Sequence, residues 1–210
     1  MDERTAAGLM GRIEPFRVLD EGMRLRLAEQ ATRRVVDRGQ MLFWQDEPGE
    51  GMFVLLEGAV KLVVRSRSGD LIELHRHDAP AVFGELAVLD GGPRSASAEA
   101  VEPSTLLMVT RAELLRLIRA DEQVAEALLR ILGAMVRRTT RQVSDLTFLN
   151  LQGRVAAKLL DLAEAGQART RRITQVELAT MVGGARQTVN QALRSLESRG
   201  YIRSAGRAFE

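Results

Sequence analysis

The period of the hydrophobic pattern changes near Arg111, and this change restricts the possible folds more than any other feature of the sequence. Between about Val35 and Val109, short apolar runs are separated by glycine-rich breaks, as expected for many short strands. Beyond Arg111, apolar residues recur at helical spacing. The pattern predicts an α+β protein in which an all-β sandwich or roll comes first and helices follow.

One long helix, roughly 121–149, carries a seam at the spacing of a two-stranded coiled coil. The seam residues are Leu128, Leu132, Met135, Thr139, Val143 and Leu146. Thr139 is a polar interruption of the kind that paired helices usually show. The seam predicts a homodimer, and the alternative is a helix that packs on the β domain of its own chain.

The C-terminal part of the chain is basic. Residues 151–210 carry 10 Lys and Arg against 5 Asp and Glu, whereas residues 1–150 carry 20 against 23. This asymmetry indicates a polyanionic partner for the C-terminal part alone. We expect helices over 154–165, 174–182 and 186–199, the last closed by a left-handed Gly200, and a small β wing formed by 201–203 and 208–209.

Residues 174–199 meet the steric demands of a helix-turn-helix. Ala179 is small where the two helices touch, Gly183 fits the turn, and Val189 faces inward from the second helix. The face opposite Val189 can hydrogen-bond to base edges and has no acidic side chain; its residues are Arg186, Gln187, Asn190, Gln191 and Arg194. The pattern predicts sequence-specific binding to double-stranded DNA, and the alternative is an ordinary helical hairpin.

The composition excludes several other classes of protein. The chain has no cysteine, which excludes disulfides and thiolate-ligated metal centres. No apolar run approaches the roughly 18 residues of a membrane span, and the N-terminus is unlike a signal peptide, so we expect a cytoplasmic protein. No arrangement of Ser, His and Asp indicates nucleophilic catalysis, so we do not expect this chain to be an enzyme. We interpret His75 and His77 as surface residues rather than metal or heme ligands, and Trp44 as a core residue.

Three blocks of residues are the most informative part of the sequence: Phe83-Gly84-Glu85-Leu86 with Pro93-Arg94-Ser95-Ala96, the helix end Leu146-Thr147-Phe148-Leu149, and the segment from Ile173-Thr174 to Arg194. Together they resemble the cAMP receptor protein (CRP/FNR) family of bacterial transcription regulators, and the likeness covers most of the chain. The resemblance implies a cyclic-nucleotide-binding β-roll sensor domain over 1–120, a dimerisation helix and hinge over 121–150, and a winged helix-turn-helix domain over 151–210.

The first block is a candidate phosphate site. Gly84 lets the backbone approach a ligand, and Arg94 can hold a cyclic phosphate through two parallel hydrogen bonds. By resemblance, Glu85 accepts from the ribose hydroxyl, while Thr139 and Thr140 contact adenine, one from each subunit, which indicates cAMP as an effector rather than a cofactor. The implied site consists of Gly84, Glu85, Leu86, Arg94, Ser95, Thr139 and Thr140. The alternatives are a Glu85–Arg94 salt bridge that braces a turn and threonine hydroxyls bonded to their own helix.

The third block implies DNA contacts by Thr174, Arg186, Gln187, Asn190, Gln191 and Arg194. Two such helices in a homodimer read inverted half-sites, so we expect a pseudo-palindromic operator, with RNA polymerase as a further partner. Gln187 and Gln191 replace a Glu and an Arg that the family typically carries, so the half-site is expected to differ. Ala185 stands where Ser or Thr usually caps the second helix, which leaves Gly184 as a poorer cap.

Two other interpretations remain open. The same scaffold can respond to another effector or act without one. The chain can also be a cyclic-nucleotide-binding regulatory subunit of an enzyme or channel. The segment 174–199 argues against a regulatory subunit, because such a subunit needs no base-reading helix.

Overall fold

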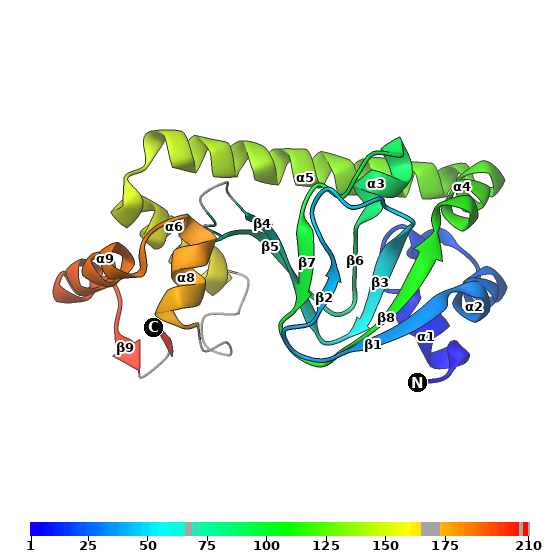
Figure 1. Cartoon of the computed structure of the whole chain (residues 1–210), viewed down its shortest axis with the longest axis horizontal. Coiled ribbons are helices and arrows are strands. Elements are labelled where there is room, and N and C mark those ends of the chain that lie inside the picture. Colours follow the sequence, from blue (N-terminus) through cyan, green and yellow to red (C-terminus); the bar gives the residue numbers. More distant parts are fainter. Residues whose placement is uncertain (66–68, 70, 165–172, 206–207, 210) are drawn as a thin grey trace. The chain divides into compact units, whose positions relative to one another are not determined.

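The computed structural model describes residues 1–65, 69, 71–164, 173–205 and 208–209. The chain divides into two compact units, the first of Met1–Val64 with Leu74–Met135 and the second of Arg65–Glu73 with Val136–Glu210. Figure 1 shows the strands and their flanking helices in the N-terminal part and a group of shorter helices in the C-terminal part.

Within the described residues, eight strands form two four-stranded sheets, in the orders β1-β8-β3-β6 and β2-β7-β4-β5. The strands are β1 (Thr32–Val36), β2 (Met41–Phe43), β3 (Gly51–Glu57), β4 (Ala59–Arg65), β5 (Leu71–Asp78), β6 (Ala81–Phe83), β7 (Ser97–Ala100) and β8 (Ser104–Thr110). An apolar interior that includes Phe53, Val60 and Leu106 lies between the two sheets. The fold confirms the predicted β roll.

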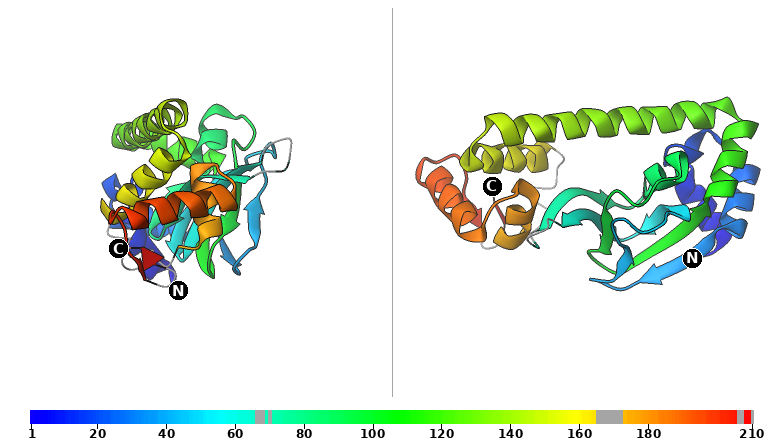
Figure 2. Two further views of the ribbon diagram at one scale, coloured as in Figure 1. Left: turned by 90° about the vertical axis from the view of Figure 1, so that its left-hand side faces the viewer. Right: turned by 45° about the horizontal axis from the view of Figure 1, so that its top comes forward.

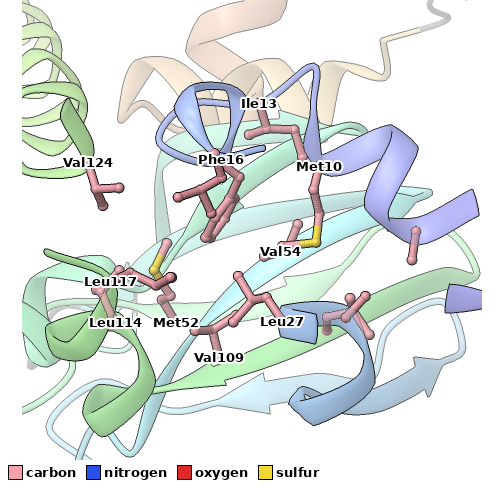
Figure 3. Close-up of a cluster of buried hydrophobic side chains, with 14 of the residues drawn as sticks. Met10, Ile13, Phe16, Leu27, Met52, Val54, Val109, Leu114, Leu117 and Val124 are labelled. Atoms are coloured by element: carbon pink, nitrogen blue, oxygen red, sulfur yellow. The ribbon is translucent and has the colours of Figure 1, made fainter. Parts of the chain in front are cut away.

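Helices cover the outer side of the sheet that contains β3 and β8. They are α1 (Glu3–Met10), η1 (Phe16–Val18), α2 (Glu21–Gln30) and α4 (Arg111–Ala120). Side chains alternate along a strand, so Met52 and Val54 of β3 face these helices, whereas Phe53 faces the roll interior. Figure 3 shows this second core, in which Phe16 and Leu114 pack against the strands. The hydrophobic pattern did not indicate α1 and α2.

Helix α5 (Glu122–Phe148) confirms the predicted long helix, but its first turns belong to the core of its own chain. Leu128 is 3% exposed and packs in the outer core, which is the core between the sheet with β3 and β8 and its covering helices. Its assignment to the dimer seam was therefore wrong. Leu129 and Val136, which follow at seven-residue spacing, are 66% and 63% exposed. The free apolar stripe therefore lies one residue beyond the predicted one in this part of the helix.

The second unit contains, in its described part, α6 (Leu151–Glu164), α8 (Gln175–Val182) and α9 (Arg186–Ser198), followed by the strands β9 (Ser204–Ala205) and β10 (Ala208–Phe209). Its core includes Val155, Leu178, Val189 and Leu196. β9 and β10 pair in an antiparallel ribbon, which places the first wing strand at 204–205 instead of the predicted 201–203. Gly200 has a φ of 76° and closes the region after α9, as predicted. The three helices can be followed in the second view of Figure 2.

None of the helices in the described ranges is long and apolar enough to cross a membrane.

Candidate functional site

A short helix, α3 (Glu85–Asp90), links β6 to the segment that carries Arg94, and a left-handed glycine starts it. Gly84 has a φ of 76°, a conformation that glycine adopts without strain. A Cβ atom on Gly84 would lie 2.8 Å from Nη1 of Arg94. Gly84 is therefore needed both for the turn and for the close approach of the arginine.

Arg94 is fixed inside this turn although it is charged. Its side chain is 4% exposed; Nη1 donates a hydrogen bond to the Gly84 carbonyl at 2.8 Å, and Nη2 donates to the Gly51 carbonyl at 2.6 Å. Among the described residues, its buried Nε has no hydrogen-bond partner. The Cζ atom lies 4.2 Å from the centroid of the Phe43 ring, a cation–π contact.

Burial lowers the pKa of Arg94, while the charges of Glu47 and Glu50 act in the opposite direction. The guanidinium of an arginine stays protonated at neutral pH, because it is a very strong base. The turn therefore presents a desolvated positive charge, and its Nε–H donates to no acceptor among the residues that the structure describes. Such a charge suits a phosphate group.

The first unit brings together four of the predicted effector residues: Gly84, Glu85, Leu86 and Arg94. Glu85 is buried at the start of α3, and Ser95 is exposed directly after Arg94. Thr139 and Thr140 are exposed on the part of α5 that belongs to the second unit, so their role in the site stays a prediction. The Thr140 hydroxyl donates to the Val136 carbonyl of the preceding turn at 2.9 Å.

The interior of the roll next to Arg94 is aromatic. Phe43 stacks on Phe53 with 5.6 Å between ring centroids, and Phe53 stacks on Phe83 at 5.5 Å. The His77 ring in turn stacks on Phe83 at 5.5 Å. His75 and His77 are half-buried on β5, so each keeps part of its side chain at the surface.

Trp44 was expected in the core, but it is 49% exposed. It follows β2 at the point where the chain leaves the sheet, and its backbone N–H donates to the Glu47 carboxylate at 2.8 Å. The described residues contain no cluster of three His, Cys, Asp or Glu side chains that could hold a metal ion.

The helix-turn-helix is built as its steric pattern predicts. The Thr174 side chain accepts from the Glu177 N–H at 3.2 Å, and the Glu177 carboxylate accepts from the Thr174 N–H at 2.7 Å, which forms the predicted capping box at the start of α8. Gly183 ends α8 with a φ of 62°. Ala179 and Val189 are buried where α8 and α9 meet.

The cap of α9 differs from the prediction. Ala185, not Gly184, is the N-cap, and it offers no side-chain hydrogen bond. Gly184 has a packing role instead, because a Cβ atom there would lie 2.6 Å from Cδ1 of Leu151 on α6.

The outer face of α9 is polar and basic. Val189, Ala192, Leu193 and Leu196 are buried, as predicted, whereas Arg186, Gln187, Gln191 and Arg194 are exposed. Asn190 is only half exposed, and its Oδ1 is buried and finds no hydrogen-bond partner in the part of the chain that the structure describes. Thr188, which the sequence pattern did not indicate, is also exposed beside Gln187. A polar face of this kind fits the edges of base pairs and the phosphates beside them.

Comparisons with known proteins agree with both the β roll and the helix-turn-helix. A model of the cyclic nucleotide-binding domain matches residues 33–121, and a model of the Crp-like helix-turn-helix domain matches residues 153–210. The chain is 35% identical to the CRP-like cAMP-activated global transcriptional regulator of Mycobacterium tuberculosis, over 99% of this chain and 94% of that protein. It is 34% identical to the cyclic AMP receptor protein of Thermus thermophilus, over 81% of this chain and 79% of that protein.

Solved structures show the same fold. The catabolite activator protein of Thermus thermophilus matches with a TM-score of 0.58 and 31% identity, over 93% of this chain and 92% of that one. The c-di-GMP-responsive global regulator CLP of Xanthomonas campestris matches with a TM-score of 0.78, over 90% of this chain and 98% of that one. At 20% identity, this second likeness concerns the fold alone.

Proposed function

Because the chain belongs to the cAMP receptor protein (CRP/FNR) family of transcription regulators, we propose that it is a homodimeric DNA-binding regulator whose effector is cAMP. In this proposal, residues 1–120 form the sensor, 121–150 the dimerisation helix and hinge, and 151–210 the DNA-binding domain. Binding of the effector changes the affinity for DNA, and the regulator acts on RNA polymerase at its promoters.

The observation that supports a cyclic nucleotide as the effector is the buried Arg94 guanidinium beside Gly84. A buried cation is costly unless it is paired, and a cyclic phosphate supplies one negative charge and oxygen acceptors for the Nε–H and the other unused N–H groups of Arg94. Relatives named for cAMP at 34% and 35% identity support adenine over other bases, and the hydroxyls of Thr139 and Thr140 are suited to hydrogen-bond it.

The proposal that the chain binds specific DNA sequences rests on the exposed face of α9. In a homodimer, two such helices related by a two-fold axis read half-sites about 34 Å apart, so the operator is a pseudo-palindrome. Arg186 is placed to bind a guanine through O6 and N7. Arg194 lies two turns further along the helix and is assigned to a phosphate, which adds affinity on every sequence alike.

The proposal is tested with the purified full-length chain. Calorimetry with cAMP, cGMP and cyclic di-GMP should show that cAMP binds most tightly, at one molecule per chain. Selected operator DNA should then bind about tenfold more tightly when cAMP is present, in line with the usual size of allosteric coupling. Tighter binding of cyclic di-GMP than of cAMP, or an unchanged DNA affinity, would contradict the proposal.

Residue 187 is expected to set one position of the operator. The amide of Gln187 fits adenine, whereas a carboxylate accepts from the amino group of cytosine. Selection from a random DNA library should therefore give different motifs for the wild type and for Gln187→Glu, each symmetric about the two-fold axis. Arg194→Ala serves as a control, because losing a phosphate contact lowers affinity without changing the motif. Identical motifs for the wild type and Gln187→Glu would mean that residue 187 reads no base.

A further inference from the structure

The edge strand β1 carries an arginine on the side that faces the interior of the roll. β1 is the end strand of its sheet and lies beside β8 (Figure 1). Opposite residues of an antiparallel pair share one face of the sheet. Arg33 lies opposite Leu107, which belongs to the outer core. Arg34 lies opposite Leu106, which is buried between the two sheets, so the side chain of Arg34 extends toward the interior of the roll.

The ring of Phe53 connects Arg34 to the proposed effector site. The Cζ atom of Arg34 lies 5.8 Å from the Phe53 centroid, and the Cζ atom of Arg94 lies 5.6 Å from the same centroid. Both distances are within the range of a cation–π contact. Phe53 is 2% exposed and belongs to the interior of the roll. One interior ring therefore contacts two cations, of which Arg94 is buried and Arg34 is exposed.

The two positive charges are close enough to affect each other. Burial is the main cause of the lowered pKa of Arg94, and the charge of Arg34 acts in the same direction. Each guanidinium therefore disfavours the charge of the other. An anion bound at Arg94 offsets this repulsion, because it attracts both cations.

No carboxylate in the described part of the chain forms an ion pair with Arg34, whereas Lys61, Arg76 and Arg130 each pair with one. The contact of Arg34 with the Phe53 ring covers apolar surface, which a neutral side chain would do as well. The positive charge therefore has no evident role within the fold. An exposed cation at the border of an anion site raises the local concentration of anionic ligands and their rate of association.

We propose that Arg34 is a second cation of the effector site, which attracts the phosphate of the effector and speeds its entry, while Arg94 binds the phosphate directly. This inference rests on the function proposed above and extends it, because the sequence pattern did not indicate Arg34. The two arginines act over different ranges. Buried Arg94 offers hydrogen bonds that salt screens little, whereas exposed Arg34 acts through its charge, which salt screens beyond about 10 Å at about 0.1 M.

The inference is tested by measuring how fast the full-length protein associates with fluorescently labelled cAMP at low and at high salt. Arg34→Gln removes the charge but keeps a polar side chain. At about 20 mM salt, we expect this variant to associate about five- to tenfold more slowly than the wild type and to bind correspondingly more weakly. At about 500 mM salt, the difference should fall below about twofold, because the charge is then screened.

Three further variants show whether the charge at this position is what matters. Arg34→Lys keeps the charge and should behave like the wild type at both salt concentrations. Arg94→Met should bind weakly at both, because it removes a buried donor. Arg33→Gln is the matched control: it removes the same charge from the adjacent exposed position, whose side chain extends from the other face of the strand. We expect its association rate to stay within about twofold of the wild type at low salt.

The possible results separate this inference from the proposed function. An equal loss in Arg33→Gln and Arg34→Gln would mean that net charge alone matters, and a loss in Arg34→Gln that persists at high salt would mean that the residue acts by packing; either result would overturn the inference. Equal rates and affinities for the wild type and Arg34→Gln at low salt would overturn it too, while cAMP remains the effector. If the wild type binds no cyclic nucleotide in calorimetry, the proposed function itself is contradicted, and this inference with it.

Discussion

Arg94→Met is expected to weaken cAMP binding by at least about a hundredfold. A charge-assisted hydrogen bond contributes about 1.5 kcal/mol or more, so the loss of two such bonds to a phosphate amounts to about 3 kcal/mol, and each 1.4 kcal/mol is a factor of ten in affinity. Methionine keeps an unbranched apolar side chain, shorter than that of arginine, but carries no charge and donates no hydrogen bond. Calorimetry of wild type and variant with cAMP gives the ratio directly.

The same substitution should also lower the thermal stability of the protein. Arg94 donates to the carbonyls of Gly84 and Gly51, and its removal leaves two buried acceptors without a donor, at a cost of about 1–3 kcal/mol each. Arg94→Lys is the informative control, because it keeps the charge with a single nitrogen that cannot reproduce the forked contact. We expect its cAMP affinity to lie between those of the wild type and Arg94→Met. If Arg94→Met unfolds at the same temperature as the wild type and binds cAMP as tightly, Arg94 does not anchor the effector in this site.

Sequence patterns predicted those parts of the fold that local physical chemistry determines. The long helix follows from its apolar repeat, and the start of α8 follows from Thr174 and Glu177, whose side chains cap each other's backbone groups. The inward residues of α9 follow from helical spacing alone. In each of these cases, residues close in sequence decide the structure.

The sequence failed where the outcome depends on segments that are distant along the chain. Two apolar stripes run along α5 one residue apart, and only the packing of Leu128 against the outer core shows which of them is already occupied. The burial of His77 depends likewise on Phe83 and Phe53, which come from other strands. The structural role of Arg94 depends on the carbonyl of Gly51, 43 residues earlier.

The exposed apolar stripe on α5 leads to a second prediction with a large expected effect, which concerns the dimer. Leu129 and Val136 lie two helical turns apart and are among the most exposed large apolar side chains of the chain, and Val143 continues the same stripe. Apolar residues at seven-residue spacing on a free helix face are typical of a two-stranded coiled coil. We therefore expect Leu129→Glu/Val136→Glu to convert a dimer into a monomer in sedimentation velocity experiments, because it places four carboxylates near the two-fold axis.

Loss of the dimer should reduce affinity for a palindromic operator by about a hundredfold or more, since the second half-site then no longer contributes through linkage. The fold of the monomer should be retained, because both positions are exposed within one chain and surface substitutions usually change stability by about 0.5 kcal/mol or less. Ala134→Glu is the control: it adds one carboxylate per chain, against two in the double variant, at an exposed position on another side of the helix, and it should remain dimeric. If the double variant sediments as a dimer and still binds the palindrome tightly, the two copies associate through a surface other than this stripe.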